Sequence, residues 1–378
     1  MNCDSVIELE KRFGVIEIPQ IPDTTNFWML RSKGGFFYEE FIRERFVGLA
    51  WNYIEKNTSF EKNNIEQLKE GIKYWYSDKV PMTAINKCNR FINEIKEGDY
   101  VAIPSKGSAE IALCRFGEYF ETDYDVSKEI LEIKKIENKD AELGTVKCPY
   151  KKRRKIEVLI RIKTVRLGPH LIRAISSYHG LSDMNSYAID ILNCIYDCYI
   201  YQNSVMFSIN ISKKTPIKAR EMSKLMYGIT EMFCSIIDEE CINITANINS
   251  PGKVVTFLKN CYDKLGKNAW KILLLYVAIF GGSAFGFEFN GIAGSATEII
   301  KEIRTMDIDV ALRKEELNEK RLDNCLKTVE LIKAVGGDDV DIQNALLALE
   351  TMDSLNESLQ FKSNEEFAKQ QEESIKNK

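Results

Sequence analysis

The chain has 378 residues, which is long for one compact domain and predicts two or three units of about 100–200 residues each. Hydrophobic residues make up 44% and charged residues 29%, a globular composition that excludes a collagen-like or largely disordered chain. Its 52 basic residues are balanced by 56 acidic ones, which excludes a protein that coats nucleic acid through a positive excess. The acidic excess is concentrated in residues 301–378, which hold 12 basic and 18 acidic residues.

The cysteine and histidine residues do not form a recognisable metal or catalytic motif. Cys194 and Cys198 lie four residues apart, but no second pair or histidine follows at ligand spacing. His170 and His179 have no Cys or Ser partner at a motif spacing, so no nucleophilic triad is predicted. The first residues lack the basic and apolar segments of a signal peptide. We therefore expect a cytoplasmic protein whose ten cysteines are reduced and mostly buried.

After a lead-in over residues 1–25, strand signals dominate the chain as far as residue 165. Alternating apolar residues predict the strands, a period of 3.6 predicts the helices, and Gly98-Asp99 predicts a turn. In chain order the predicted elements are a strand at 27–30, a helix at 36–46, a strand at 46–51, helices within 56–96, a hairpin of 100–104 and 111–116, and strands at 130–136 and 156–165. Residues 26–165 therefore predict a small β-barrel that carries a few helices.

The rest of the chain predicts two further regions and a tail. Residues 166–262 predict an α+β module, with helices at 169–178, 186–200 and 216–238 and strands at 205–212 and 242–248. Residues 263–361 predict a helical region: an apolar run at 272–280, several glycines, a long charged helix at 296–335 and a shorter one at 342–359. Residues 362–378 are polar and predict a flexible tail. The predicted fold class is α+β.

Four segments of the first region carry a resemblance to a known family. They are WMLRSKGG at 28–35, VGLAW at 47–51, EGDYV at 97–101 and IPSKG at 103–107. In this order they resemble EVE-like members of the PUA superfamily, in particular the N-terminal module of Mrr-like restriction proteins and related prokaryotic antiviral defence proteins. The resemblance covers about residues 26–165. It implies a PUA-like barrel with a concave pocket, which several members use to take a flipped and often modified nucleobase.

The resemblance also implies which residues would bind the ligand. A flipped base needs aromatic faces for stacking and polar groups for its edge, and Trp28 and Trp51 can supply the faces. Basic side chains can contact phosphates, and glycines allow a ligand to approach backbone N–H groups closely. The candidate ligand-binding residues are Trp28, Arg31, Lys33, Gly34, Gly35, Trp51, Ser105, Lys106 and Gly107. Alternatively, the tryptophans belong to the barrel core and the glycines are required by turns. No cofactor is implied.

The densest basic run is 151–155, directly before a predicted strand. One interpretation is that Lys152, Arg153 and Arg154 contact phosphates at an edge of the same module. The other interpretation is a solvated loop.

The function predicted from these observations is a sensor of prokaryotic antiviral defence. Its first region would bind a nucleic acid or a nucleotide, and its C-terminal region would oligomerise or act as the effector, because the apolar spacing within 296–335 favours helix packing.

Two alternatives remain open. One is a modification-dependent nuclease, for which Glu132-Ile133-Lys134 on a strand would supply part of a Mg²⁺ site, although no such triplet follows residue 165. The other is a membrane effector that uses residues 272–287, an apolar run shorter than the roughly 20 residues needed to span a bilayer.

Overall fold

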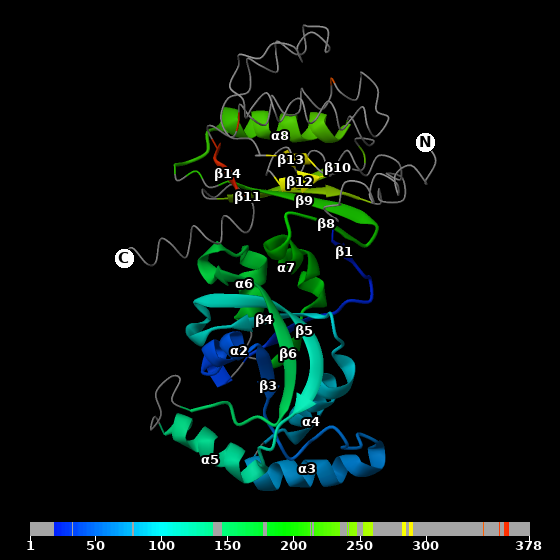
Figure 1. The fold of residues 1–378 in the computed structure, drawn as a ribbon, viewed down its shortest axis with the longest axis vertical. Helices are drawn as coiled ribbons and strands as arrows, with labels where there is room; N and C mark the ends of the chain where they lie inside the picture. Colours follow the sequence, from blue (N-terminus) through cyan, green and yellow to red (C-terminus); the bar gives the residue numbers. More distant parts are fainter. Residues whose placement is uncertain are drawn as a thin grey trace. The chain divides into compact units, whose positions relative to one another are not determined.

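The protein forms two units, which are described separately. The computed structural model describes residues 19–31, 33–77, 79–138, 146–176, 180–211, 213, 215–234, 240, 242–247, 252–259, 282–284, 287–289, 343, 355 and 359–362. The first unit is Thr24–Ile195, and the second combines Met1–Asp23 with Tyr196–Lys378. Both contain helices and a sheet, so the predicted α+β class is confirmed (Figure 1). The first unit runs 30 residues past the predicted boundary at 165, because later elements pack onto its sheet.

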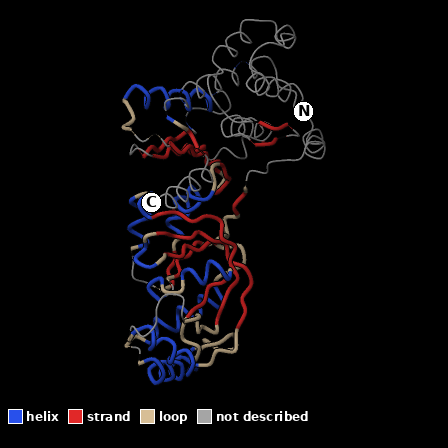
Figure 2. Tube along the Cα trace, turned by 60° about the vertical axis from the view of Figure 1, so that its left-hand side comes forward, coloured by secondary structure: helices blue, strands red, loops and turns tan. Residues whose placement is uncertain are grey.

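The first unit is built on a six-stranded sheet with the order β3-β6-β5-β4-β2-β7. Strands β2 and β4 are parallel, and the other neighbours are antiparallel. The long strands β5 and β6 shift register twice, and such irregularities bend a sheet. The sheet curls into a half-barrel (Figure 2), whereas the sequence predicts a small β-barrel. The strands are β2 (Phe27–Leu30), β3 (Phe46–Leu49), β4 (Tyr100–Pro104), β5 (Glu110–Glu121), β6 (Lys152–Lys163) and β7 (Leu181–Asp183).

Helices and short helical turns connect these strands. The helices predicted within 36–46 and 56–96 are confirmed, and α3 and α5 lie at the same end of the unit (Figure 1). The helices are α2 (Tyr38–Glu44), α3 (Lys62–Tyr76), α4 (Pro81–Asn89), α5 (Val126–Glu137), α6 (Pro169–Ile175) and α7 (Ala188–Ile195). The turns are η1 (Lys33–Gly35), η2 (Arg90–Glu94), η3 (Lys106–Ser108), η4 (Thr164–Arg166) and η5 (Asn185–Tyr187).

Helix α5 replaces the strand that the sequence predicts at 130–136, so that prediction is wrong. The side chain of Asp125 caps the helix by accepting a hydrogen bond of 2.7 Å from the backbone N–H of Lys128. Ile133 and Ile136 then pack against the hydrophobic core. Their spacing of three residues places them on one face of a helix, whereas on a strand they would point to opposite sides.

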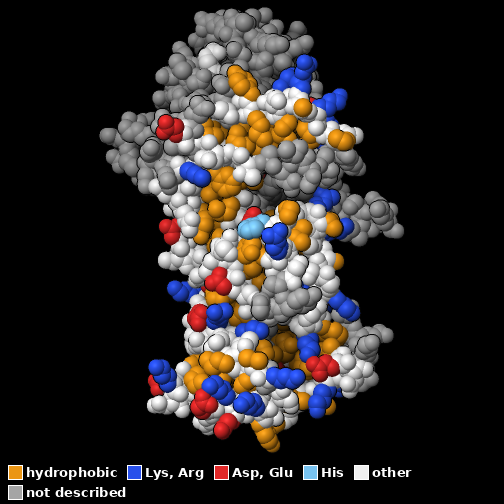
Figure 3. Space-filling view, turned by 180° about the vertical axis from the view of Figure 1, so that it is seen from behind, with side chains coloured by type: hydrophobic (Ala, Val, Ile, Leu, Met, Phe, Trp, Pro, Cys, Tyr) orange, Lys and Arg blue, Asp and Glu red, His pale blue; other side chains and the backbone are white. Residues whose placement is uncertain are grey.

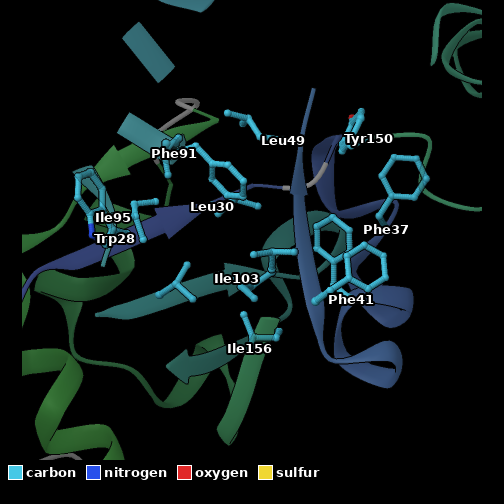
Figure 4. Packing of buried hydrophobic residues seen from close by; sticks show 14 of the residues in the cluster. Trp28, Leu30, Phe37, Phe41, Leu49, Phe91, Ile95, Ile103, Tyr150 and Ile156 are labelled. Atoms are coloured by element: carbon cyan, nitrogen blue, oxygen red, sulfur yellow. The ribbon is translucent and has the colours of Figure 1, made fainter. Parts of the chain in front are cut away.

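One hydrophobic cluster holds the first unit together. It joins aromatic and aliphatic side chains of the half-barrel with those of the helices that cover it. Figure 4 shows Phe41 of α2 and Phe37, which directly precedes α2, beside β3, and Trp28 beside Ile95 on the other side of the cluster. Phe37, Phe41 and Phe91 are fully buried, so this cluster dominates the apolar burial of the unit.

The second unit contains a mixed sheet with the order β1-β8-β9-β11-β10, and β14 also pairs with β9. Helix α8 (Ala219–Cys234) connects β9 to β10, and the antiparallel β11 separates these two parallel strands, which makes a split β-α-β module. Leu225, Ile229 and Phe233 form the buried stripe of α8 over the sheet. The strands are β1 (Gln20–Ile21), β8 (Cys198–Tyr201), β9 (Ser204–Ile211), β10 (Ile242–Asn247), β11 (Gly252–Leu258) and β14 (Phe361–Lys362).

Two differences from the sequence analysis concern this module. The helix predicted at 186–200 ends at Ile195, and its last residues instead form β8. The sequence analysis predicted no strand in this module after residue 248, but Gly252–Leu258 forms β11. It pairs along its whole length with β9 and forms a hairpin with β10, and its run Val254–Phe257 consists of residue types that favour strands.

Most of the predicted region 263–361 lies outside the described residues, including 272–281 and the helix predicted at 296–335. Within the described part, β12 (Gly282–Ala284) and β13 (Phe287–Phe289) form an antiparallel pair. Leu355 and Leu359 are buried in the second core. Among the described residues, none of the helices is both long enough and apolar enough to cross a membrane.

The described cysteines are free thiols, and most are buried. Cys88, Cys114, Cys148 and Cys198 are buried, and Cys194 is partly exposed. Burial raises the pKa of Cys88 to about 11 and that of Cys198 to about 12, because the thiolate loses its hydration.

We expect iodoacetamide to label Cys194 at pH 8 about tenfold faster than the four buried cysteines, which are neither exposed nor ionised at that pH. Peptide mapping by mass spectrometry after timed labelling would measure this, with the urea-unfolded protein as the reference for full reactivity. Rapid labelling of Cys114 in the native protein would contradict the expectation, because it would show that β5 opens readily.

Candidate functional site

A cavity of about 760 Å³ lies within the first unit. Its walls come from the end of β3 with the following Trp51 loop (residues 50–54), from one face of α5, and from the connection between α3 and α4. The residues after β2 and Gly180 complete it. The sequence analysis predicted Trp51, Arg31 and Lys33 as ligand-binding residues, and the fold brings these three together on the cavity wall.

Four aromatic side chains line the cavity. Trp51 is half-buried, and Trp75 at the end of α3 is 38% exposed although it lines the cavity. Tyr76 and Tyr150 line it as well. The ring of Trp51 also has the Lys87 ammonium 5.8 Å from its centroid. The cavity therefore offers several flat faces for a planar ligand. Trp75, Tyr76 and Tyr150 were not among the predicted residues.

The Trp51 loop has an unusual backbone. Trp51 has φ of 66°, in the left-handed region that bulky side chains seldom adopt. Glu129 on α5 accepts the N–H of Trp51 at 2.8 Å on Oε1 and the N–H of Asn52 at 2.7 Å on Oε2. Two consecutive N–H groups can point at one carboxylate because of this backbone turn. Glu129 therefore holds the loop in the conformation that places the Trp51 ring at the cavity.

Buried charges complete the support of this loop. The Tyr76 hydroxyl donates to Glu129 Oε2 at 2.6 Å. Lys152 Nζ donates to the carbonyls of Trp51 at 2.6 Å and Ile54 at 2.7 Å. Burial disfavours the charged form of both groups, so it raises the pKa of Glu129 and lowers that of Lys152. The hydrogen bonds from Tyr76 and the backbone oppose the shift at Glu129. Each charge is thus satisfied by fixed partners, which makes this wall rigid. No local sequence signal could have identified Glu129, because helical glutamates are usually exposed.

Basic residues also line the cavity. Arg31, Lys33, Lys79 and Lys134 line it, against the carboxylates of Glu129 and Glu137. Figure 3 shows one face of the molecule, on which Lys and Arg side chains lie among hydrophobic ones at the lower end of the view. This combination of aromatic faces and cations is typical of sites for nucleotides.

Arg31 is held in place by two hydrogen bonds, and a third donor is buried without a partner among the described residues. Its Nη2 donates to the Ile175 carbonyl at 2.5 Å, and its backbone N–H donates to the Gly180 carbonyl at 2.7 Å. Its Nε is buried and has no hydrogen-bond partner in the part of the chain that the structure describes. Buried donors are rarely left without an acceptor in native proteins.

Trp28 is not part of the cavity wall. Its side chain is 5% exposed in the hydrophobic core, and its Nε1 donates to Asp99 Oδ2 at 3.0 Å. Asp99 also accepts the backbone N–H groups of Asn26 and Lys96, so the indole is tied to a polar cluster at the start of β4. Trp28 is therefore a core residue and not the stacking residue that the resemblance implied.

We expect Trp28→Phe to lower the free energy of unfolding by about 2 kcal/mol, because Asp99 loses a charge-assisted hydrogen bond. Trp75→Phe, at an exposed position, should change it by about 0.5 kcal/mol or less. Urea unfolding followed by circular dichroism would measure both. An unchanged midpoint for Trp28→Phe would show that the Asp99 contact contributes nothing.

The predicted residues of η1 and η3 contact each other rather than the cavity, apart from Lys33. A Cβ on Gly35 would lie 2.3 Å from the backbone N of Lys106, so these two turns are packed backbone to backbone. A Cβ added at Gly34 or at Gly107 would have no atom within 4 Å, although both residues have φ of +67°. Ser105 Oγ accepts the Glu110 N–H at 2.9 Å and closes the hairpin. Lys106 has an exposed side chain that does not line the cavity.

The basic run 152–154 has a structural role, which corrects the predicted phosphate contacts. Lys152 and Arg154 are buried on the inner face of β6. Arg154 donates to backbone carbonyls at the end of η2, the closest being Ile95 at 2.7 Å. Arg153 donates to the carbonyls of Cys148 and Tyr150 and lies 4.2 Å from the Phe46 ring centroid. All three cations are committed to protein partners, and the buried pair cannot reach an external phosphate.

The triplet considered for a nuclease does not lie on a strand. Glu132 and Lys134 belong to α5, and Glu132 pairs with Lys135 at 2.7 Å one helical turn away. Lys134 lines the cavity, but Glu132 does not. Within the described ranges, no three His, Cys, Asp or Glu side chains are grouped so that they could hold a metal ion.

In comparisons with known proteins, the chain matches no family model, no curated protein and no solved structure. The resemblance to EVE-like modules stays a prediction from four sequence segments. The function is therefore inferred from the chemistry of the cavity.

Proposed function

We propose that the cavity of the first unit binds a nucleobase, either in a free nucleotide or flipped out of a nucleic acid. The observation that supports this is one cavity lined by Trp51 and Trp75 together with four cationic side chains. Its volume of about 760 Å³ is that of a ligand site, which for small molecules is about 300–1,000 Å³. The rigid support of the Trp51 loop favours binding to a preformed site.

Stacking and charge would act together in this site. A base stacked on an aromatic side chain contributes about 1–3 kcal/mol, and this contribution tolerates any base because each has a π-face. Lysine and arginine side chains attract the phosphates of the same nucleotide. The two carboxylates that line the cavity, Glu129 and Glu137, would repel a ligand that is only an anion. A planar base with a limited anionic part is the ligand class that suits both features.

The biological role that we propose follows from the sequence resemblance. A protein with an EVE-like pocket would act as a sensor of prokaryotic antiviral defence that recognises a base, including a modified one. The C-terminal region would then oligomerise or act as the effector. A pull-down between two differently tagged copies of the chain, with and without a bound oligonucleotide, would test the oligomerisation.

The base-binding proposal is tested by fluorescence polarisation with short DNA and RNA, unmodified and carrying modified cytosines. We expect Trp75→Ala to weaken binding by about 5–150-fold, the equivalent of about 1–3 kcal/mol. Tyr227→Ala is the control, because Tyr227 is an aromatic residue on α8 of the second unit, is 65% exposed and does not line the cavity. It should leave the affinity within about twofold.

Repeating the measurement at two salt concentrations separates base recognition from phosphate attraction, because the phosphate contribution falls steeply with salt. A loss in Trp75→Ala that persists at high salt supports a base in the cavity. Binding that Trp51→Ala and Trp75→Ala both retain would show that nucleic acid does not use this cavity. Absence of binding by the wild type to every oligonucleotide and nucleotide tested would overturn the proposal.

A further inference from the structure

The cavity runs along α5, and its two ends differ in their chemistry. Glu129, Ile130, Ile133, Lys134 and Glu137 all line it, and their spacing places them along one face of the helix. Eight residues separate the two glutamates, which corresponds to about 12 Å along the helix. That length is comparable with a nucleoside monophosphate from the edge of the base to the phosphate.

The end at Glu129 is aromatic. Its carboxylate receives hydrogen bonds from the Tyr76 hydroxyl and from the Trp51 backbone N–H, so both residues adjoin this end. Trp75 precedes Tyr76 and also lines the cavity. Three protein donors already occupy the Glu129 carboxylate: the N–H groups of Trp51 and Asn52 and the Tyr76 hydroxyl.

The end at Glu137 is cationic. Lys33 Nζ pairs with Glu137 Oε1 at 2.6 Å, and Lys134 lies one helical turn before Glu137. Arg31 also lines the cavity, and its buried Nε–H has no partner in the described part of the chain. Glu137 is the carboxylate that pairs with Lys33, and its side chain is 56% exposed. The Glu137 carboxylate is therefore an exposed anion that a phosphate could replace as the partner of Lys33.

We propose that the cavity takes a nucleotide whose base lies between Trp51 and Trp75 and whose phosphate lies at Arg31, Lys33 and Lys134. The phosphate replaces Glu137 as the partner of Lys33 and accepts the hydrogen bond that Arg31 Nε now lacks. A guanidinium with a free N–H matches the oxygen geometry of a phosphate, and a lysine adds a point charge. This inference rests on the proposed function, to which it adds the position and the requirement of the phosphate.

The test compares each nucleoside with its 5′-monophosphate by calorimetric titration of the full chain. The probes are cytidine, 5-methylcytidine, adenosine and guanosine, and a trinucleotide of each base. We expect the monophosphate to bind about tenfold or more tightly than the nucleoside, because the phosphate meets three cations. The mononucleotide and trinucleotide arms tell whether a free nucleotide or a strand supplies the phosphate.

Two variants test the position of the phosphate. Glu137→Gln removes the competing carboxylate and should strengthen monophosphate binding about threefold to tenfold, without changing nucleoside binding. Glu132→Gln is the matched control, because it removes the same charge from the same helix but outside the cavity. Lys33→Gln should weaken the monophosphate by about tenfold and leave the nucleoside unchanged. Both altered side chains are partly exposed, so the variants should fold.

The outcomes separate this inference from the proposed function. Equal affinities for nucleoside and monophosphate, or equal effects of Glu137→Gln and Glu132→Gln, would overturn the phosphate position while the base-binding function stands. Failure of nucleosides, monophosphates and trinucleotides to bind would overturn the proposed function itself. Phosphate-dependent binding that Lys33→Gln abolishes and Glu137→Gln strengthens supports the inference.

Discussion

Replacing Glu129 by alanine is expected to lower the free energy of unfolding of the first unit by about 3–5 kcal/mol. The carboxylate is 1% exposed and accepts hydrogen bonds from Trp51 N–H, Asn52 N–H and the Tyr76 hydroxyl. Alanine would leave all three donors without this acceptor, and the buried Lys152 would lose a nearby negative charge. The Trp51 loop would also lose the contact that stabilises its left-handed backbone. Urea unfolding monitored by tryptophan fluorescence would measure the loss.

The same helix provides the control for this experiment. Glu132→Ala removes a carboxylate whose partner is Lys135 at the surface, and it should cost about 0.5 kcal/mol. If Glu129→Ala does not fold, Tyr76→Phe removes one of the three hydrogen bonds to Glu129, together with the weaker one of 3.2 Å from the Tyr53 N–H, and should cost about 1–2 kcal/mol. Equal stabilities of the Glu129 and Glu132 variants would show that the loop does not depend on the buried carboxylate.

Glu129 also makes the stability of this unit depend on pH in a defined direction. Its folded-state pKa is raised by burial, so the folded state retains the proton to a higher pH than the unfolded state. The contribution of this group is therefore most favourable below its unfolded pKa and declines as the pH rises through its folded pKa. The decline should be absent from Glu129→Gln, which cannot titrate. Urea midpoints measured from pH 4 to pH 8 for both proteins would check this.

The second large effect is expected at the contact between η1 and η3. Gly35→Ala should lower the free energy of unfolding by about 3–5 kcal/mol, because the new Cβ meets backbone rather than a movable side chain. The closest atoms are the N of Lys106 at 2.3 Å and the carbonyl carbon of Ser105 at 2.4 Å. The φ of +90° at Gly35 adds strain for any residue with a Cβ. Thermal and urea unfolding would measure the change.

Gly34→Ala is the matched control in the same turn. Gly34 has φ of +67°, but its Cβ would meet no atom within 4 Å, so only the backbone strain of about 1 kcal/mol is expected. Because Lys33 lies in η1, Gly35→Ala should also weaken the binding of a phosphorylated ligand, if it folds. Equal destabilisation by the two alanines would show that the turns can separate without cost.

Much of the local structure could be predicted from the sequence, because it depends on short-range patterns. The hairpin of β4 and β5 follows from alternating apolar residues, with Ser105 and Gly107 at the turn. Helix α8 follows from its apolar stripe. The prediction was wrong at residues 130–136, where isoleucines suggested a strand. The Asp125 cap and the core contacts of these residues favour helix α5 instead. It was also wrong at β8, where pairing with β9 overrides a helical pattern.

By itself, the sequence determined the fold class and most elements of the first unit, and it singled out Trp51, Arg31 and Lys33, which the structure places on the cavity wall. Only the tertiary structure decided which side chains face the cavity. The pairing of Leu49 with Lys152 in the half-barrel, and the alternation along β6, turn Lys152 inward to support the Trp51 loop. Glu129 joins this site from 77 residues away along the chain, as measured from Asn52. Such register and long-range contacts depend on which strands and helices meet, and no local spacing in the sequence encodes that choice.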